Sequence, residues 1–303
     1  MAEHKTVDQV EAGELERPVT ARKGAGTPEE HLLIVRDDRH CRVDDIPRWW
    51  MNNDPVATAW YNSVSASLPR GEAFFVETMR YFKDHVPPRM AQELRSFIRQ
   101  EVNHSREHIA FNRMAQDHGY DIESIDKGIR EMLALTEGRD IELNLAVTIT
   151  LEHFAACISH ELLSDPRYLE KADPRVAEMW RWHSAEEIEH KGITYDVWTH
   201  ATRDWTAWRR WKVKALIGGL ITLKYFKNRR KDAYHLMAQD GIGPVRARWE
   251  LFRHLWIEPG MMRKMLPAVL SQFLPGFHPW KHDNRKLIGL YESPYSDAVM
   301  PAE

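Results

Sequence analysis

Cysteine is scarce in this sequence, and its scarcity argues against two classes of protein. The 303 residues contain two cysteines, Cys41 and Cys157, which lie far apart and form no paired spacing. Small secreted scaffolds depend on several disulfides, and structural zinc sites depend on closely spaced thiolates. We therefore expect neither a disulfide framework nor a thiolate zinc site, and a reducing cytoplasm is the simplest compartment.

Strand patterns are missing as well. No run of alternating apolar and polar residues is bounded by turns, whereas helical periodicity recurs along most of the chain. A short helix is expected to end near Ser67, before a turn at Leu68–Gly71. Longer helices are expected at about 72–85, 89–118, 142–163 and 174–200, with a shorter one at 123–135. The predicted fold is all-α: an antiparallel four-helix bundle with extra helices and a C-terminal helical extension.

The domain organisation follows from changes in composition. Residues 1–40 are polar and are predicted to be disordered, with no export signal; 41–202 would form the bundle. Residues 203–303 would form a helical extension and tail packed on the bundle. Within the extension, residues 203–231 hold ten Lys or Arg and one acid, Asp204.

Long uncharged apolar runs are absent from this basic segment. Lys214 and Lys224 leave only Ala215–Leu223 uncharged, far short of the roughly 20 residues that cross a bilayer. A basic helix with tryptophans suits peripheral contact with an anionic membrane, an acidic partner or a lipid-like substrate, or else a solvated outer helix. A net charge of -3 gives no general attraction to nucleic acid. The expected location is cytoplasmic, with contact at the inner membrane face in the first case.

Histidine is plentiful, with sixteen in the chain, and three histidine and glutamate side chains form one stripe in the segment 174–200. His183, Glu187 and His190 are separated by four and three residues. At about 100° per residue they fall within an arc of about 60° on one helix face. A single metal ion can contact all three.

A second stripe runs in the opposite order in the segment 89–118. Glu101, His104 and His108 are separated by three and four residues. Both stripes contain Glu-x-x-His, the spacing that lets a carboxylate and an imidazole one helical turn apart share an ion. Such a motif alone is usually a solvated surface pair. Two of them together favour a metal site.

Two isolated glutamates match these stripes. Glu152 lies within the apolar run 145–158, 35 positions before Glu187, and Glu72 lies 29 positions before Glu101. A carboxylate on an apolar helix face is costly unless it is paired, protonated or bound to metal. A two-metal site between four helices needs such a lone glutamate from each of two helices.

Several neighbouring residues have more than one interpretation. Glu77 competes with Glu72 for the first-helix position. His108 suits a ligand, a buried core histidine or, preferably, a group that hydrogen-bonds a ligand. Glu186 borders the stripe, whereas Glu189 is expected to point away into solvent.

Small side chains accompany Glu152 on its helix. Ala155, Ala156 and Ser159 are too short to fill the space beside a metal pair, so they indicate either a pocket or close helix packing. The two interpretations stay open on the sequence alone.

These motifs resemble a known family. The segments 68–75, 100–108, 151–154 and 182–191 look like the bacterial family of predicted metal-dependent hydrolases. The fold of that family resembles the ferritin-like di-iron superfamily, and His-x-x-x-Glu-x-x-His is similar to the last helix of di-iron arylamine N-oxygenases. The resemblance implies seven metal ligands: Glu72, Glu101, His104, Glu152, His183, Glu187 and His190. Gln100 and Glu186 replace the aspartates that precede each Glu-x-x-His in the N-oxygenases, so the resemblance does not carry a substrate.

The expected function is therefore metal-dependent. Carboxylates and imidazoles without a thiolate suit two ions of iron, or manganese or a mixed pair. The first hypothesis is an O2-dependent di-iron oxygenase or oxidase of a small organic substrate, which needs an electron donor. The alternatives are a hydrolase that uses a metal-activated water, with Glu186 or His108 handling the proton, and a non-catalytic metal-binding protein. The predicted partners also include a second copy of the chain, in a homodimer.

Overall fold

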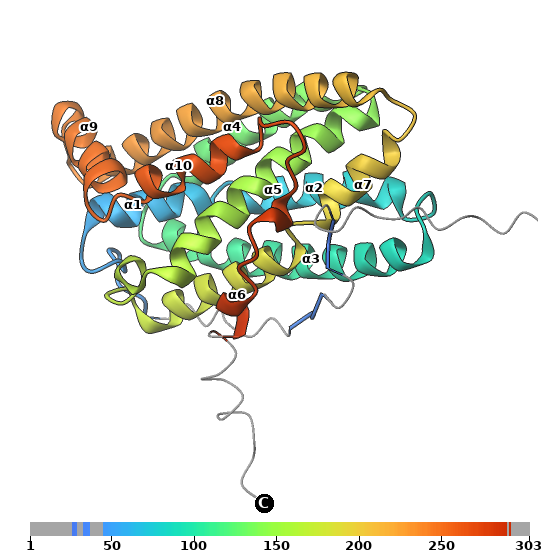
Figure 1. Ribbon diagram of the computed structural model, residues 1–303. Helices are drawn as coiled ribbons and strands as arrows, with labels where there is room; N and C mark the ends of the chain where they lie inside the picture. Colours follow the sequence, from blue (N-terminus) through green and yellow to red (C-terminus); the bar gives the residue numbers. More distant parts are fainter. Residues whose placement is uncertain (1–25, 29–32, 37–44, 290, 292–303) are drawn as a thin grey trace, which may run out of the picture.

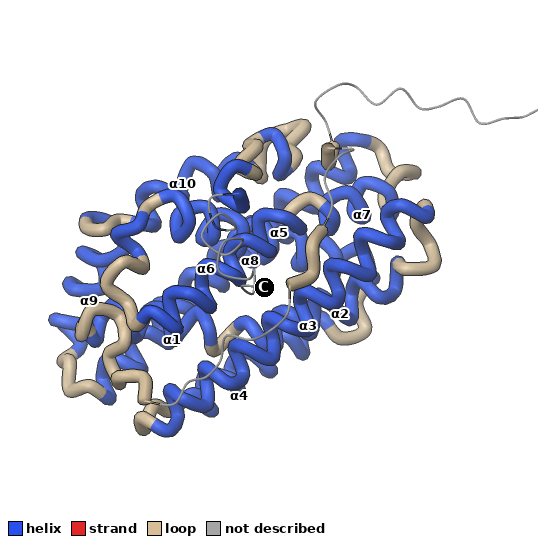
Figure 2. The backbone as a smooth tube through the Cα atoms, turned by 90° about the horizontal axis from the view of Figure 1, so that it is seen from below, coloured by secondary structure: helices blue, strands red, loops and turns tan. Residues whose placement is uncertain are grey.

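The computed structural model describes residues 26–28, 33–36, 45–289 and 291. Most of the predicted disordered segment, together with Cys41, lies outside these residues. The helices are α1 (Pro55–Ser65), α2 (Leu68–Phe82), α3 (Pro88–Asp117), α4 (Ile122–Leu133), α5 (Ile141–Ser164), α6 (Pro174–His190), α7 (Ile193–Ala201), α8 (Ala207–Gln239), α9 (Pro244–Phe252) and α10 (Met261–Ser271). The described chain contains no strand (Figure 2). The all-α prediction is confirmed.

Four of these helices carry the predicted ligands and contact one another. Packing joins α2 to α3, α5 to α6, α2 to α5 and α3 to α6. Helix α5 lies at the centre of the molecule (Figure 1) and also contacts α7, α8 and α10. Residues 145–150 of α5 are all buried, as expected for a helix covered on every side. Helix α5 is also long and apolar enough to cross a membrane, but 67% of its apolar window is buried inside the molecule, as in a core helix.

The start of α2 differs from the prediction. A turn was expected at Leu68–Gly71, yet these residues form the first turn of the helix, so α2 begins four residues before Glu72. Pro69 lies in that first turn, where a backbone N–H has no partner within the helix and a fixed φ favours helix. The proline therefore starts the helix and does not interrupt it.

The segment 174–200 is broken where a single helix was predicted. Helix α6 ends at His190 and α7 begins at Ile193. A Cβ at Gly192 would collide with the side chains of Trp280 and Thr27, so the chain approaches its neighbours too closely for any other residue. Next to it, the buried Lys191 donates to the His282 carbonyl at 2.7 Å. The segment after α10 thus crosses α5 and packs on the end of α6 (Figure 1).

The basic segment and the residues after it form helices α8, α9 and α10. Helix α8 packs on α1 and α5, and α10 packs on α5. Arg253–Ile257 form a short π-helical segment between α9 and α10. Of the helices that carry the predicted ligands, α5 is thus the one that α8 and α10 contact, and the division into a bundle and an extension stays a prediction.

Candidate metal centre

The seven predicted ligands are brought together inside the molecule. They come from α2, α3, α5 and α6, and none is more than 3% exposed. The side chains are Glu72 (α2), Glu101 and His104 (α3), Glu152 (α5), and His183, Glu187 and His190 (α6). Glu77, the rival for the first-helix position, is exposed, so the structure brings Glu72 and not Glu77 to the cluster.

One half of the cluster surrounds His190. Its Nε2 atom lies 3.1 Å from an oxygen of Glu101, 3.3 Å from Glu152 and 3.2 Å from Glu187. Ligand atoms of Glu101, Glu152 and His190 all lie within 4.8 Å of one another, close enough to share one ion. Phe97 covers the His190 ring edge-on, with ring centres 4.9 Å apart.

The other half surrounds His104 and His183. Oε1 of Glu187 lies 3.5 Å from His104 Nδ1 and 3.4 Å from His183 Nε2, and these three residues form a second group within 4.8 Å. Glu72, Glu101 and His104 form a third such group. Glu101 and Glu187 therefore contact both halves, and Glu72 belongs to this half.

Unpaired atoms converge at the centre. Eight buried side-chain atoms of this cluster have no hydrogen-bond partner in the described structure: Glu72 Oε1, both oxygens of Glu101 and of Glu152, Glu187 Oε2, His104 Nδ1 and His190 Nε2. Buried oxygens and nitrogens without a partner are rare in folded proteins, and each one is costly. Carboxylate oxygens that share a site with imidazole nitrogens are the donor set of a metal ion. The residues thus fit the predicted metals.

Each of these histidines has one ring nitrogen that points into the cluster and one that points away from it, called here the inner and the outer nitrogen. The outer nitrogen is hydrogen-bonded to a second residue. Gln100 donates its amide to Glu189 and to the Ile34 carbonyl, so its oxygen is left to accept from His190 Nδ1 at 3.1 Å. Glu186, a carboxylate, lies 3.1 Å from His104 Nε2. Since both outer nitrogens must donate, the inner nitrogens of His190 and His104 are the lone-pair nitrogens, as metal ligation requires.

His183 is oriented through His108. Asn112 donates its amide to the Ser65 carbonyl, and the Ser65 hydroxyl donates to the Asn112 side-chain oxygen. Ser65 must then accept from His108 Nδ1 at 2.9 Å, so His108 Nε2 accepts from His183 Nδ1 at 3.3 Å. The lone pair of His183 is left on Nε2, which faces Glu187.

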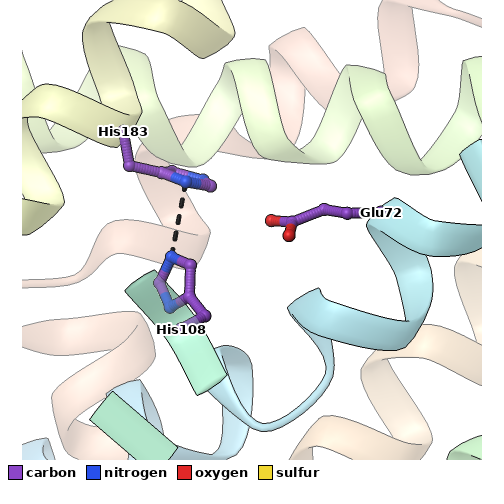
Figure 3. Close-up of side chains that lie close together, drawn as sticks. All are labelled: Glu72, His108 and His183. Atoms are coloured by element: carbon purple, nitrogen blue, oxygen red, sulfur yellow. Dashed lines mark hydrogen bonds between the residues drawn. The ribbon is translucent and has the colours of Figure 1, made fainter. Parts of the chain in front are cut away.

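Figure 3 shows this pair together with the Glu72 carboxylate, which faces the His183 ring. Ligand atoms of Glu72, His108 and His183 also lie within 4.8 Å of one another. An ion held by these three would compete with the His108–His183 hydrogen bond. The interpretation of His108 as a group that orients a ligand stays a prediction, which its hydrogen bond to His183 favours. Burial and the neighbouring His104 lower the pKa of His108 to about 3, so this imidazole is neutral.

The expectation for Glu189 is wrong. This residue is 2% exposed and accepts from the Arg36 guanidinium at 2.6 Å and from Gln100 at 3.0 Å. It points away from the metal ligands, but into a buried network and not into solvent. The partner that makes this possible is Arg36, which the sequence analysis missed.

Arg36 contacts two buried carboxylates, Glu186 and Glu189, that lie behind the predicted ligands. Its backbone N–H donates to Glu186 at 2.9 Å, and its guanidinium contacts both Glu186 and Glu189. The single positive charge of Arg36 thus compensates part of the charge of two carboxylates: Glu186, which contacts His104, and Glu189, which contacts Gln100. Arg36 follows the apolar run 32–35 and forms no motif with the clustered residues, so the sequence carries no signal for this role.

We expect Arg36→Gln to weaken metal binding by about 10- to 100-fold, the usual effect of removing a residue that orients ligands. Competition with a chromogenic chelator measures the affinity. Arg36→Lys should recover part of it, because a cation remains beside Glu186 and Glu189. Arg99→Gln, at an exposed position of α3, is the matched control. Equal affinities for Arg36→Gln and Arg99→Gln would contradict the role of Arg36.

Burial dominates the electrostatics of the cluster. It raises the pKa of Glu72 to about 8 and that of Glu152 to about 7, and the pKa of Glu101 is raised well above its usual range for the same reason. Burial would also raise the pKa of Glu187, but His190 and His104 outweigh it and hold that pKa well below its usual range. Without metal, the centre therefore binds protons near neutral pH.

A pocket of about 70 Å³ adjoins the cluster. Glu72, His183 and Glu187 line it on the metal side, and Ala155 and Ser159 line it from α5. These two small residues border a pocket as the sequence analysis allowed, whereas Ala156 lines a different cavity. A single water molecule needs about 10–15 Å³ of such space, so the pocket has room for a small organic group.

Most of the remaining pocket wall is apolar, with Leu151, Ile158, Met132 and Tyr225 among its residues. Arg229 also lines it, but its guanidinium is paired with Asp232 at 2.7 Å and with the Ser63 carbonyl. A molecule bound in the pocket beside Glu72 and Glu187 would therefore meet a mostly apolar wall.

Comparison with curated proteins and comparison with solved structures find no match to this chain. A family model described as "Predicted metal-dependent hydrolase" matches residues 35–283. That range holds the seven clustered residues, Arg36 and the pocket. The likeness to ferritin-like di-iron proteins and arylamine N-oxygenases stays a prediction. The chain belongs to the family of predicted metal-dependent hydrolases.

Proposed function

We propose that the protein is a hydrolase that holds two metal ions among its seven clustered side chains. The convergence of eight unpaired buried ligand atoms carries this proposal. Glu101, Glu152 and His190 would hold one ion, and Glu72, His104 and His183 the other. Glu187, whose oxygens lie near histidines of both halves, would bridge them.

The donor set favours particular metals. It consists of four carboxylates and three imidazoles, and the described groups that can hold an ion include no thiolate. Hard oxygen donors with imidazole suit iron or manganese. Four buried carboxylates also need several positive charges to compensate them, which two ions supply.

The bound ions, the pocket and the residues that hydrogen-bond the histidines would have different roles in hydrolysis. The bound ions would supply an acidified water and polarise a substrate oxygen. The pocket beside Glu72 and Glu187 excludes bulk water and holds the apolar part of a small substrate. Glu186 and His108, the predicted proton-handling groups, are each hydrogen-bonded to a ligand histidine, so they act as positioning residues for His104 and His183.

Anaerobic hydrolysis tests this proposal. The protein is loaded with Fe²⁺ or Mn²⁺ and assayed with small chromogenic esters and phosphoesters in the strict absence of O2. We expect cleavage that a chelator abolishes and added metal restores. Full metal content without any cleavage of these substrates would count against the hydrolase.

A second function is favoured by the apolar pocket. A mostly apolar wall suits a substrate without the polar groups that hydrolysis acts on, and a carboxylate-rich site between four helices is similar to sites that perform O2 chemistry. Stoichiometric O2 uptake by the reduced iron protein, with an electron donor, would replace the hydrolase by a di-iron oxygenase or oxidase. Metal binding with neither activity would leave a non-catalytic metal-binding protein.

We expect Ala155→Leu to fill much of the pocket and to lower turnover at least about tenfold while metal content stays unchanged. The added methyl groups occupy the space beside Glu187 but contact no outer partner of the histidines. Steady-state rates and metal analysis measure the two effects separately. Ala73→Leu, at an exposed position of α2, is the control. Turnover equal to that of the control would show that this pocket does not hold the substrate.

A further inference from the structure

Exposed apolar side chains are concentrated in one part of the molecule. Among the described residues, twelve of the sixteen exposed large apolar side chains lie between residues 208 and 274. We call these twelve the outer apolar surface; they belong to α8, α9, the π-helical segment, α10 and the residues that follow it. Isolated exposed apolar residues are ordinary, but a large group of them marks an interaction site.

Helix α8 contributes a continuous stripe to this surface. Leu216, Leu220 and Leu223 are 67%, 52% and 74% exposed. At about 100° per residue, the three fall within an arc of about 60°. Lys212 and Lys227 are exposed within or next to the same arc. The helix therefore presents leucines and cations together, while its opposite face packs on α1 and α5.

The end of α10 lies beside α8 and carries further exposed leucines. The Trp211 indole of α8 donates to the Phe273 carbonyl at 2.9 Å, and Gly218 of α8 lies against Phe273. Both α8 residues lie on the side of the helix opposite the leucine stripe. Leu270 and Leu274, which are 51% and 62% exposed, therefore flank the packed side of α8 and not the stripe itself.

The exposed charges around the outer apolar surface are almost all positive. Between residues 208 and 274, nine Lys or Arg side chains are exposed, and Glu258 is the one exposed acid. Trp208 and Trp249 are also exposed here, and tryptophan favours the boundary between lipid and water. A surface that combines leucine, tryptophan and cations has the chemistry of a lipid headgroup boundary.

We propose that the outer apolar surface docks on an anionic lipid membrane. The charge of the surface selects this occupant, because a second copy of the chain would place the exposed cations of two molecules against each other. Contact is peripheral: helix α8 lies in the headgroup region with Leu216, Leu220 and Leu223 inserted and the flanking cations on anionic headgroups.

The other side of α8 faces the pocket beside the metal centre. Tyr225, Asn228 and Arg229 line that pocket, and they lie on the side of the helix opposite Leu216, Leu220 and Leu223. Docking through the leucine stripe would therefore leave the pocket on the protein side of α8, and the docking proposal does not rest on the proposed function.

Vesicle co-sedimentation tests the docking. The metal-loaded full chain is mixed with phosphatidylcholine vesicles or with vesicles that contain about 30% of the anionic lipid phosphatidylglycerol. We expect binding to the anionic vesicles that falls as salt rises. Lys212→Glu or Lys227→Glu should weaken binding at least about fivefold, since each basic residue contributes about that factor. The double substitution Leu216→Asp and Leu223→Asp should weaken it at least about tenfold.

Leu135→Asp is the matched control, because Leu135 is 57% exposed but lies outside the outer apolar surface. Circular dichroism and metal content confirm that each variant is folded. Equal sedimentation with both vesicle types, or equal binding by the double variant and the control, would overturn the proposal. So would a dimer in analytical ultracentrifugation that the double variant dissociates, because a second copy would then be the occupant.

Discussion

Glu187→Ala is expected to reduce the metal content of the purified protein to less than about a tenth. Glu187 is the residue whose oxygens lie within 3.5 Å of all three ligand histidines, so its loss removes a donor from both halves of the cluster. The substitution also removes the carboxylate oxygen that lies 3.4 Å from His183 Nε2. Mass spectrometry of metals after gel filtration measures the content, and activity should fall in parallel.

A matched control distinguishes ligand loss from a general loss of charge. Glu77→Ala removes a carboxylate from the exposed face of α2 and should retain full metal content. Glu187→Gln should bind metal as poorly as Glu187→Ala, because a neutral amide is a weak donor of similar shape. Full metal content in either Glu187 variant would show that the cluster is not the metal centre.

The metal-free protein is expected to lose stability as pH rises from about 6.5 to 8. In this window unfolded glutamates carry almost no protons, and unfolded histidines lose theirs as pH rises. The folded protein keeps some, because the pKa of Glu72 is about 8 and that of Glu152 about 7, and because glutamate neighbours raise the pKa values of His104 and His190. The folded state binds more protons, so its free energy of unfolding falls as pH rises, by about 2 kcal/mol from the two glutamates.

The metal-loaded protein should respond in the opposite direction. Protons compete with metal ions for the same carboxylates and imidazoles, so metal affinity increases with pH. The decrease in Tm caused by a chelator should therefore be larger at pH 8 than at pH 6.5, by about 5 °C. Glu72→Gln should reduce the pH dependence of the metal-free protein. A decrease in Tm that is the same at both pH values would contradict this account.

The sequence predicted the positions of most helices but not every boundary. Long apolar periodicities identified α3 and α5 to within about one residue, because their buried faces recur along many turns. The first turn of α2 and the break at Gly192 were missed for different reasons. Pro69 allows either a turn or a helix start, and the break depends on Trp280, which is distant in sequence.

The convergence of the seven predicted side chains was more predictable than their surroundings. Glu-x-x-His spacing is a local signal, and both copies converge as the helical period requires. The residues that orient the histidines carry no such signal. Arg36 is 150 positions from its partner Glu186, and Ser65 is 43 positions from its partner His108. No local sequence pattern predicts contacts between residues so far apart. Glu189 was wrongly expected in solvent because its partner Arg36 could not be inferred.

The end of α6 has a consequence for how the centre is made. His190 is the last residue of α6, and the next two residues are held by the segment that contains Trp280 and His282. Arg36 supports the same turn from the opposite end of the described chain through Glu189. The position of His190 therefore depends on contacts between segments that lie far apart in the sequence. The last turn of α6 reaches its final geometry only when both segments are in place.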